Sequence, residues 1–225
     1  MGAINYVQKK LPMSISIPLR KLSRDLRGLP SSLRHYEAAR LINKSEPVIF
    51  EIGCNNGDDT LAFLAEIPRA KMYCFEPDPL AVRRFKERLG ADLSKVTLSE
   101  IAISDRTGTI DFRPNSGGNL PEGSPQVEID KTITANTCRL DDWCSENGVT
   151  DIDFIWMDVL GAEGDVIAGA ANALARTRFL YTGYSNTETY QGQPSLDKLH
   201  ALLPSYEVVV KYAGDVLLKN RTPGA

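Results

Sequence analysis

From residue 47 onward, short apolar runs alternate with segments whose apolar residues recur at helical spacing. The run VIFEIG at 48–53 predicts a strand buried on both faces, and DTLAFLAEI at 59–67 has the spacing of a helix. Strands that alternate with helices form right-handed βαβ units, which build a parallel sheet covered by helices on both faces. The segment 206–220 predicts a closing antiparallel hairpin with its turn near Gly214-Asp215. The pattern therefore predicts one doubly wound α/β domain.

The same periodicity places the remaining elements. The runs at 107–114 and 127–140 predict antiparallel strands on either side of a polar insert at 115–125. Other strands are expected at 71–77, 95–104, 151–159 and 178–185, and helices at 78–90, 140–147, 162–176 and 195–203, the last capped by Ser195.

Residues 1–46 differ from the remainder in charge. They contain nine Lys and Arg against three acids, a balance of +6, so the remainder carries −9 because the whole chain carries −3. Segment 18–43 predicts one or two helices that are interrupted at Gly28 and Pro30, with Ser31 or Ser32 capping the second piece. A basic arm of this kind can contact an anionic partner or its own acidic body. We predict a basic helical extension at 1–46 and a second domain at 47–225.

Composition narrows the class of protein. No run approaches the roughly eighteen apolar residues of a membrane span, and no apolar core follows the first charges as in a secretory signal. The four cysteines form no CxxC pair, which favours free thiols in a reducing compartment over a zinc site. Aromatic residues do not interleave with the basic ones as single-stranded nucleic acid requires. We expect a cytoplasmic protein that binds no nucleic acid; the sequence does not indicate its oligomeric state.

A bent loop follows the first strand. Gly53 and Gly57 lie four residues apart at the carboxyl end of that strand, where open α/β sheets bind their ligands. The dinucleotide fingerprint G-x-G-x-x-G is not met, although a nicotinamide dehydrogenase stays open as an alternative. Glu76 ends the second strand, twenty-five residues after Glu51, where a carboxylate can accept hydrogen bonds from ribose hydroxyls. The loop and Glu76 together predict a nucleoside-containing cofactor.

The loop resembles the E/D-x-G-x-x-x-G loop of class I S-adenosylmethionine-dependent methyltransferases. Further stretches resemble the FkbM family of these enzymes over roughly residues 47–210: FEPDPLAVRRFKERL, AISDRTGTIDF, RLDDWCSENGVTDIDFIWMDVLGAEGDVIAGA and YSNTETYQGQPSL. The resemblance implies a Rossmann-like, mostly parallel seven-stranded sheet with a terminal antiparallel hairpin. It also implies O-methylation of a hydroxyl on a sugar, a polyketide or another natural product, with S-adenosylmethionine as the methyl donor.

The resemblance also implies a cofactor site. Asp59 and Thr60 open the helix after the loop, whose amides suit the carboxylate of the cofactor. Glu76 would hold the ribose, Glu100 and Ile101 would flank the adenine, and Asp158 would face the methyl group. Ala102, Ser104 and Asp105 would continue the adenine wall. The full cofactor set is Glu51, Gly53, Asn55, Gly57, Asp59, Thr60, Glu76, Pro77, Glu100, Ile101, Ala102 and Asp158.

Catalysis of O-methylation calls for a base near the acceptor hydroxyl. Asp158 is the first candidate, as base or as an orienting carboxylate, and His35 is the second if the N-terminal helix lies over the site. His200 is expected to be structural. Asp158 with Glu163 could hold Mg²⁺, but one or two acids do not make a metal site. Candidates for acceptor binding are Leu160, Glu163, Tyr184, Asn186, Glu188, Tyr190, Gln191 and the 115–125 insert.

Two positions depart from the family pattern. The stretch D-V-E/Q-G-A-E reads here Asp158-Val-Leu160-Gly-Ala-Glu163, and the fifth strand ends in Gly183-Tyr184 instead of Glu followed by an aromatic residue. Both positions should border the acceptor. The departures leave two hypotheses open: an O-methyltransferase with altered acceptor preference, or a protein that binds S-adenosylmethionine in a regulatory or binding role without efficient turnover.

Overall fold

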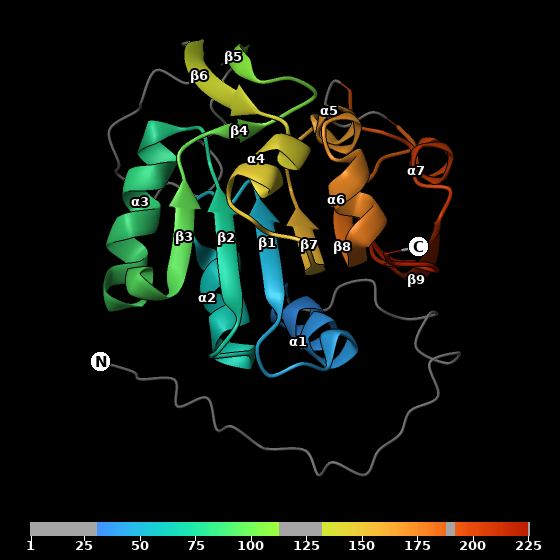
Figure 1. Ribbon diagram of the computed structural model, residues 1–225, viewed down its shortest axis with the longest axis horizontal. Coiled ribbons are helices and arrows are strands. Elements are labelled where there is room, and N and C mark those ends of the chain that lie inside the picture. Colours follow the sequence, from blue (N-terminus) through green and yellow to red (C-terminus); the bar gives the residue numbers. More distant parts are fainter. Residues whose placement is uncertain (1–30, 113–131, 188–191, 225) are drawn as a thin grey trace.

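The computed structural model describes residues 31–112, 132–187 and 192–224, and a seven-stranded sheet lies at its centre (Figure 1). The strand order is β3-β2-β1-β7-β8-β10-β9, in which the first five are parallel and β10 runs antiparallel to both of its neighbours. The predicted doubly wound fold with a terminal hairpin is therefore confirmed. The strands are β1 (Val48–Ile52), β2 (Lys71–Phe75), β3 (Val96–Ser99), β7 (Ile152–Met157), β8 (Thr177–Gly183), β9 (Tyr206–Lys211) and β10 (Asp215–Asn220).

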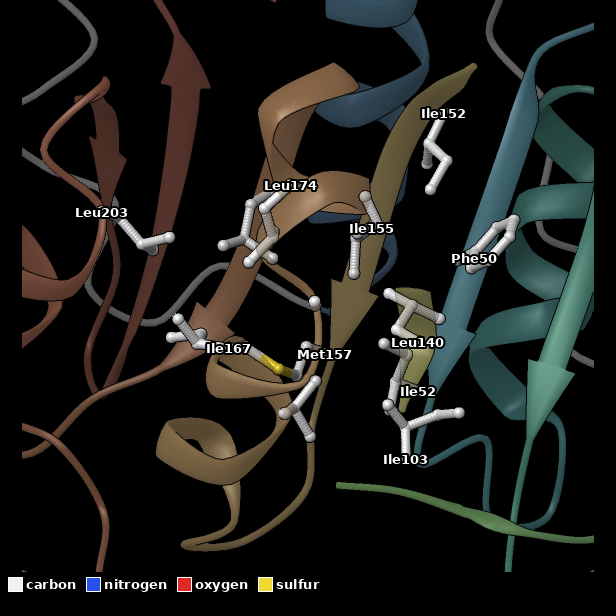
Figure 2. Close-up of a cluster of buried hydrophobic side chains, with 14 of the residues drawn as sticks. Phe50, Ile52, Ile103, Leu140, Ile152, Ile155, Met157, Ile167, Leu174 and Leu203 are labelled. Carbon is white, nitrogen blue, oxygen red and sulfur yellow. The ribbon is translucent and has the colours of Figure 1, made fainter. Parts of the chain in front are cut away.

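Each face of the sheet has its own buried cluster, which explains why the central strands are mostly apolar. Along β7, Ile155 and Met157 belong to one cluster while Phe154 and Trp156 belong to the other. Figure 2 shows the first cluster, in which side chains of β1 and β7 meet Leu140 and others from the covering helices. The helices over this face are α4 (Leu140–Glu146), α5 (Glu163–Ala168), α6 (Ala171–Arg176) and α7 (Leu196–Leu202). The helices over the opposite face are α1 (Ser31–Ile42), α2 (Asp58–Glu66) and α3 (Pro79–Leu89). Helix α3 is followed by the 3-10 turn η2 (Gly90–Lys95).

A second sheet lies beyond the carboxyl ends of β1, β2 and β3 (Figure 1). It contains β4 (Ala102–Ile103), β5 (Gly108–Phe112) and β6 (Ile133–Cys138), with β5 and β6 antiparallel as predicted. The expectation of a single strand at 95–104 was wrong, because β3 and β4 belong to different sheets. Between them, the exposed carboxylate of Glu100 pairs with Lys86, so this position leaves the buried sheet. The chain thereby turns over the end of the main sheet.

The single helix expected at 162–176 is also divided. Helix α5 ends at Ala168 and α6 begins at Ala171, with Gly169 and Ala170 between them. A Cβ on Gly169 would lie 1.9 Å from the carbonyl oxygen of Ser104, which directly follows β4. The close approach of the two backbones explains the break.

The N-terminal helix belongs to the packed structure. Helix α1 already includes Ser31 and Ser32, the two predicted cap positions, and it buries Ala38 and Ile42 in the cluster shared with α2. The proposed earlier helical piece lies outside the described residues, so the boundary at 46/47 stays a prediction. Across the portion of the chain that the structure describes, no helix is both long and apolar enough to cross a membrane.

Candidate active site

A cleft of about 930 Å³ lies at the carboxyl ends of β1, β2 and β7. Its floor is formed by the loops that leave these strands, and part of its far wall is β5 of the second sheet. This volume lies within the range of pockets that bind small molecules and cofactors, and the position is the one at which doubly wound sheets bind ligands. The sequence correctly located the loop, but it did not predict that Arg106 and residues 109–112 would face it.

Gly53 brings the exit of β1 against the exit of β7. Its φ is +87°, and a Cβ there would lie 2.1 Å from the carbonyl oxygen of Asp158. The amide of Asp158 in turn donates to the carbonyl of Ile52 at 3.0 Å. Only glycine permits this contact between two backbones, since left-handed φ and a missing side chain are both required. Gly53 therefore fixes where Asp158 enters the cleft.

Gly57 makes a close packing contact that the sequence did not indicate. It has φ +83° and caps α2, and a Cβ there would meet Leu89 at 2.6 Å and Phe85 at 3.0 Å. Both neighbours belong to α3, and Gly57 is not among the residues that line the cleft. The second glycine of the loop thus permits helix packing, and its predicted contact with the cofactor stays untested.

Glu51 and Thr60 form a buried pair beneath the loop. The Thr60 hydroxyl donates to Glu51 Oε2 at 2.5 Å, and both side chains are completely buried. Burial raises the pKa of Glu51 well above its ordinary value, the nearby Cys74 thiol raises it further, and the bond from Thr60 opposes the rise. Neither residue lines the cleft. In this geometry the pair supports the loop from below, although both were predicted to contact the cofactor.

Glu76 occupies the position that the sequence indicated. Its Oε2 accepts the amide of Asn55 and its Oε1 accepts the amide of Asp78, both at 2.9 Å, and the residue lines the cleft. Burial raises the pKa of Glu76, and the two backbone hydrogen bonds oppose that rise. Because each carboxylate oxygen has a second lone pair, the fixed side chain can still accept hydrogen bonds from a ligand.

The other predicted cofactor residues divide into two groups. Asp59, Pro77, Ile101, Ala102 and Ser104 line the cleft, as does Asn55. Glu100 does not line it, because its carboxylate faces Lys86 Nζ at 2.5 Å on the surface. Asp105 also lies outside the lining and accepts the hydroxyl of Ser104.

Asp158 leaves the end of β7 and lines the cleft with its side chain in contact with solvent. The protein that surrounds it raises its pKa to about 6 by desolvation, and the carboxylates of Asp215, Asp59 and Glu163 contribute to the rise while Arg34 opposes it. A carboxylate with this pKa is still ionised at neutral pH and binds a proton more readily than an ordinary aspartate.

His35 is buried behind the cleft and does not lie over it. Its Nε2 lies 2.9 Å from Asp59 Oδ1, and its ring stacks on Trp156 with 4.6 Å between centroids. The residue therefore reaches the cleft through Asp59, and direct contact with an acceptor finds no support in this placement. His200 is exposed on α7 and is not among the lining residues.

The predicted acceptor residues lie apart from one another. Leu160 lines the cleft, 38% exposed, with φ +50°. Glu163 is buried, and its Oε2 accepts the amide of Gly161 at 3.1 Å. Tyr184 packs against the first cluster and Asn186 is exposed; neither lines the cleft. Glu188, Tyr190, Gln191 and the insert at 115–125 lie outside the described residues.

Gly183 is bordered by two polar side chains, of which only Gln193 was not indicated by the sequence. A Cβ there would lie 3.3 Å from Gln193 Nε2 and 3.6 Å from Glu163 Oε1. A carboxylate at position 183 would therefore approach the buried carboxylate of Glu163. In the described ranges no three His, Cys, Asp or Glu side chains gather as a metal site.

Comparison with known proteins gives a consistent result. The family model described as the methyltransferase FkbM domain matches residues 51–214. The 2-O-methyltransferase NoeI of Sinorhizobium fredii is 45% identical over 236 residues, which cover 96% of this chain and 97% of that protein. The hexuronic acid methyltransferase AglP of Haloferax volcanii is 27% identical over 70% of this chain and 62% of its own. An rRNA methylase from Streptococcus thermophilus shares the fold with a TM-score of 0.50 at 14% identity, covering 84% of this chain and 94% of that one.

Proposed function

The chain belongs to the FkbM family of methyltransferases, and from that premise we propose that it methylates a hydroxyl group of a sugar-like acceptor with S-adenosylmethionine as donor. NoeI, the relative that aligns over nearly the whole chain, is a 2-O-methyltransferase, and AglP acts on a hexuronic acid. The observation that carries the proposal is the placement of Asp158 in the cleft, beside the glycine loop and opposite Glu76 along the strand ends.

The cleft suits the proposed donor in shape and charge. Glu76 is fixed by two backbone amides and is available to ribose hydroxyls, while Ile101 and Ala102 offer an apolar wall to the adenine. S-adenosylmethionine supplies a methyl group that is already activated on a positively charged sulfur. Within the described part of the chain, the lining contains a single basic residue, Arg106, and several carboxylates. A lining with this excess of negative charge favours a cationic ligand. The carboxylates are those of Asp58, Asp59, Glu76, Asp78, Asp111, Asp158 and Asp165.

Asp158 would remove the proton from the acceptor hydroxyl. General-base assistance requires a base that is ionised at the working pH and has the highest basicity compatible with that state. The pKa of Asp158, about 6, meets both conditions at neutral pH. The backbone contact between Gly53 and Asp158 holds this carboxylate at the strand end, so that little reorganisation is needed when an acceptor enters.

The charge around Asp158 also favours one kind of acceptor. Asp59, Glu163 and Asp215 all act on Asp158, and a second anion brought into this setting would be repelled. We therefore propose a neutral sugar-like acceptor in preference to a hexuronic acid. Leu160, apolar and partly exposed in the cleft, would contact the carbon face of the sugar ring.

The test is transfer of a labelled methyl group. The purified protein is incubated with methyl-labelled S-adenosylmethionine and a panel of neutral glycosides and hexuronic acids, and labelled products are counted. We expect transfer to a neutral glycoside, and we expect Asp158→Asn to lower kcat by about 10²- to 10⁴-fold. Binding of S-adenosylmethionine without transfer to any member of the panel would favour the alternative of a binding protein that does not turn over.

Titration calorimetry tests the cofactor site separately. Glu76→Ala should weaken S-adenosylmethionine binding by roughly 1.5–3 kcal/mol, the range for hydrogen bonds to a charged group. Glu100→Ala is the matched control, because this acid follows the neighbouring strand yet pairs with Lys86 outside the cleft. Equal losses in the two variants would remove Glu76 from its assigned role.

A further inference from the structure

An arginine from outside the family-matched domain reaches the catalytic end of the sheet. Arg34 lies on α1, before the matched range of 51–214. Its Nη1 donates to Asp215 Oδ2 at 2.7 Å and to the Tyr181 hydroxyl at 2.5 Å. The side chains of Arg34 and Asp215 are only 26% and 24% exposed, so the ion pair is partly shielded from water. The guanidinium also lies 5.1 Å from the centre of the Tyr212 ring. Arg34 is thus held on several sides.

The position of this pair follows from the strand register. Asp215 begins β10 and pairs with Gly183, the last residue of β8. Strand β8 is in turn parallel to β7, with Thr182 opposite Met157. Asp158 directly follows Met157, so Asp215 and Asp158 leave the same edge of the sheet. The pair therefore lies beside the proposed base.

The charges that act on Asp158 come from four elements or the loops next to them. Asp59 of α2, Glu163 of α5 and Asp215 of β10 are carboxylates, and Asp59 faces His35 of α1. Arg34 of α1 is the cation among the four groups that shift Asp158. Farther from Asp158, the Tyr212 hydroxyl donates to Glu37 Oε2 at 2.5 Å, which anchors the same helix.

We propose that Arg34 is a positioning residue of this methyltransferase, which fixes Asp215 at the start of β10 and balances its charge beside Asp158. The inference rests on the proposed function, because it concerns the base assigned there. Without the guanidinium, the carboxylate of Asp215 would act on Asp158 with no compensating positive charge, and Asp158 would bind a proton more readily. A protonated Asp158 cannot accept the proton of a hydroxyl.

The two partners of this ion pair should have opposite effects. Removal of the positive charge in Arg34→Met raises the pKa of Asp158, whereas removal of the negative charge in Asp215→Asn lowers it. A purely structural ion pair predicts instead that both variants lose stability and that neither shifts Asp158 systematically. The direction of the two shifts separates these cases.

The primary measurement is the titration of Asp158 by carboxyl carbon NMR, with the resonance assigned from its absence in Asp158→Asn. We expect a rise of about half a pH unit or more in Arg34→Met, a fall of similar size in Asp215→Asn, and little change in Arg34→Lys. Arg178→Met is the matched control, since Arg178 Nη1 contacts Asp153 Oδ1 at 3.1 Å near the start of β7, away from Asp158. It should leave the titration unchanged.

Shifts in the same direction, or no shift in Asp215→Asn, would overturn the proposal. If Arg34→Met does not fold, Asp215→Asn and Arg34→Lys still decide, because only the proposed role predicts a fall in one and no change in the other. The acid limb of kcat/KM for the best glycoside of the panel is then measured in each variant. If the variants shift the pKa of Asp158 measured by NMR but leave the acid limb of kcat/KM unchanged, Asp158 is not the base. The effect of Arg34 on the charge of Asp158 would still stand.

Discussion

At the scale of the residue, Asp158 combines exposure to the cleft with a raised pKa, and the combination has a consequence for stability. The folded protein holds its pKa near 6, above the ordinary value of about 3.9 for an unfolded chain. Between these two values the folded state binds more protons than the unfolded state, so stability falls as pH rises through this window. The proposed base is therefore held at some expense to the fold at neutral pH.

Asp158→Asn should accordingly be more stable than the parent at pH 7 and above. The advantage should shrink as pH falls through 6 and should vanish below about 4, where the carboxyl is protonated in both states. Urea unfolding at a series of pH values measures it, with Asp105→Asn as control because Asp105 lies outside the cleft lining. A constant difference across the pH range would show that the pKa of Asp158 is not shifted.

Single residues were predictable where local spacing carried the information. Gly53 follows the first strand, where a bent loop needs a glycine, and Glu76 is the acid at the end of the second strand. Both residues line the cleft. The pairing of Arg34 with Asp215 joins residues 181 positions apart, and no local pattern marks either of them. The family resemblance implied that Glu100 flanks the adenine, but a motif does not show which way a side chain points, and this carboxylate pairs with Lys86.

At the scale of the element, the break between α5 and α6 determines how closely the second sheet approaches. Gly169 lies under the Ser104 carbonyl, and Ser104 lines the cleft. Periodicity could not predict the break, because the apolar residues on both sides keep one helical phase. The division of 95–104 between two sheets was hidden for another reason: alternation does not say which partner a strand joins.

Gly169→Ala should destabilise the protein by about 1–3 kcal/mol, because the added carbon meets backbone that cannot rotate away. Gly164→Ala is the matched control in α5, where an added Cβ meets nothing within 4 Å. That change should be neutral or stabilising by about 0.5–1 kcal/mol, as expected for alanine in a helix. Chemical denaturation compares the two; equal effects would show that contact with Ser104 does not constrain the helix break.

At the scale of the whole molecule, the charge asymmetry of the sequence is partly resolved inside the fold. Arg34 and Lys44 of the basic segment pair with Asp215 and Asp153 of the acidic body. The sequence left two possibilities for the basic segment, contact with an anionic partner or contact with its own acidic body. Arg34 and Lys44 make the second kind of contact. The alternation of strands and helices correctly predicted a sheet covered by helices on both faces, because the alternation recurs along most of the chain.

Removal of residues 1–46 should cost far more than removal of a separate extension would. It exposes the cluster that Ala38 and Ile42 cover and breaks the bonds of Arg34 and Glu37. Loss of a buried isoleucine side chain alone typically costs about 2–5 kcal/mol. We expect the 47–225 fragment to show no cooperative thermal transition, whereas Arg40→Ala on exposed α1 surface leaves the transition nearly unchanged. A fragment with the parental melting temperature would make α1 dispensable.

The ion pair between Arg34 and Asp215 also has a consequence in time. A ribosome delivers α1 long before β10, and β1 must wait for β7 before it has both neighbours in the sheet. Contacts between residues this far apart in the chain form late in folding, because closing the long intervening segment costs conformational entropy before the contacts stabilise it. A nascent chain arrested short of residue 215 would already hold the glycine loop and Glu76, yet the arginine would have no acid to bind. The attachment of α1 to this edge of the sheet would therefore form only after β10 has been synthesised.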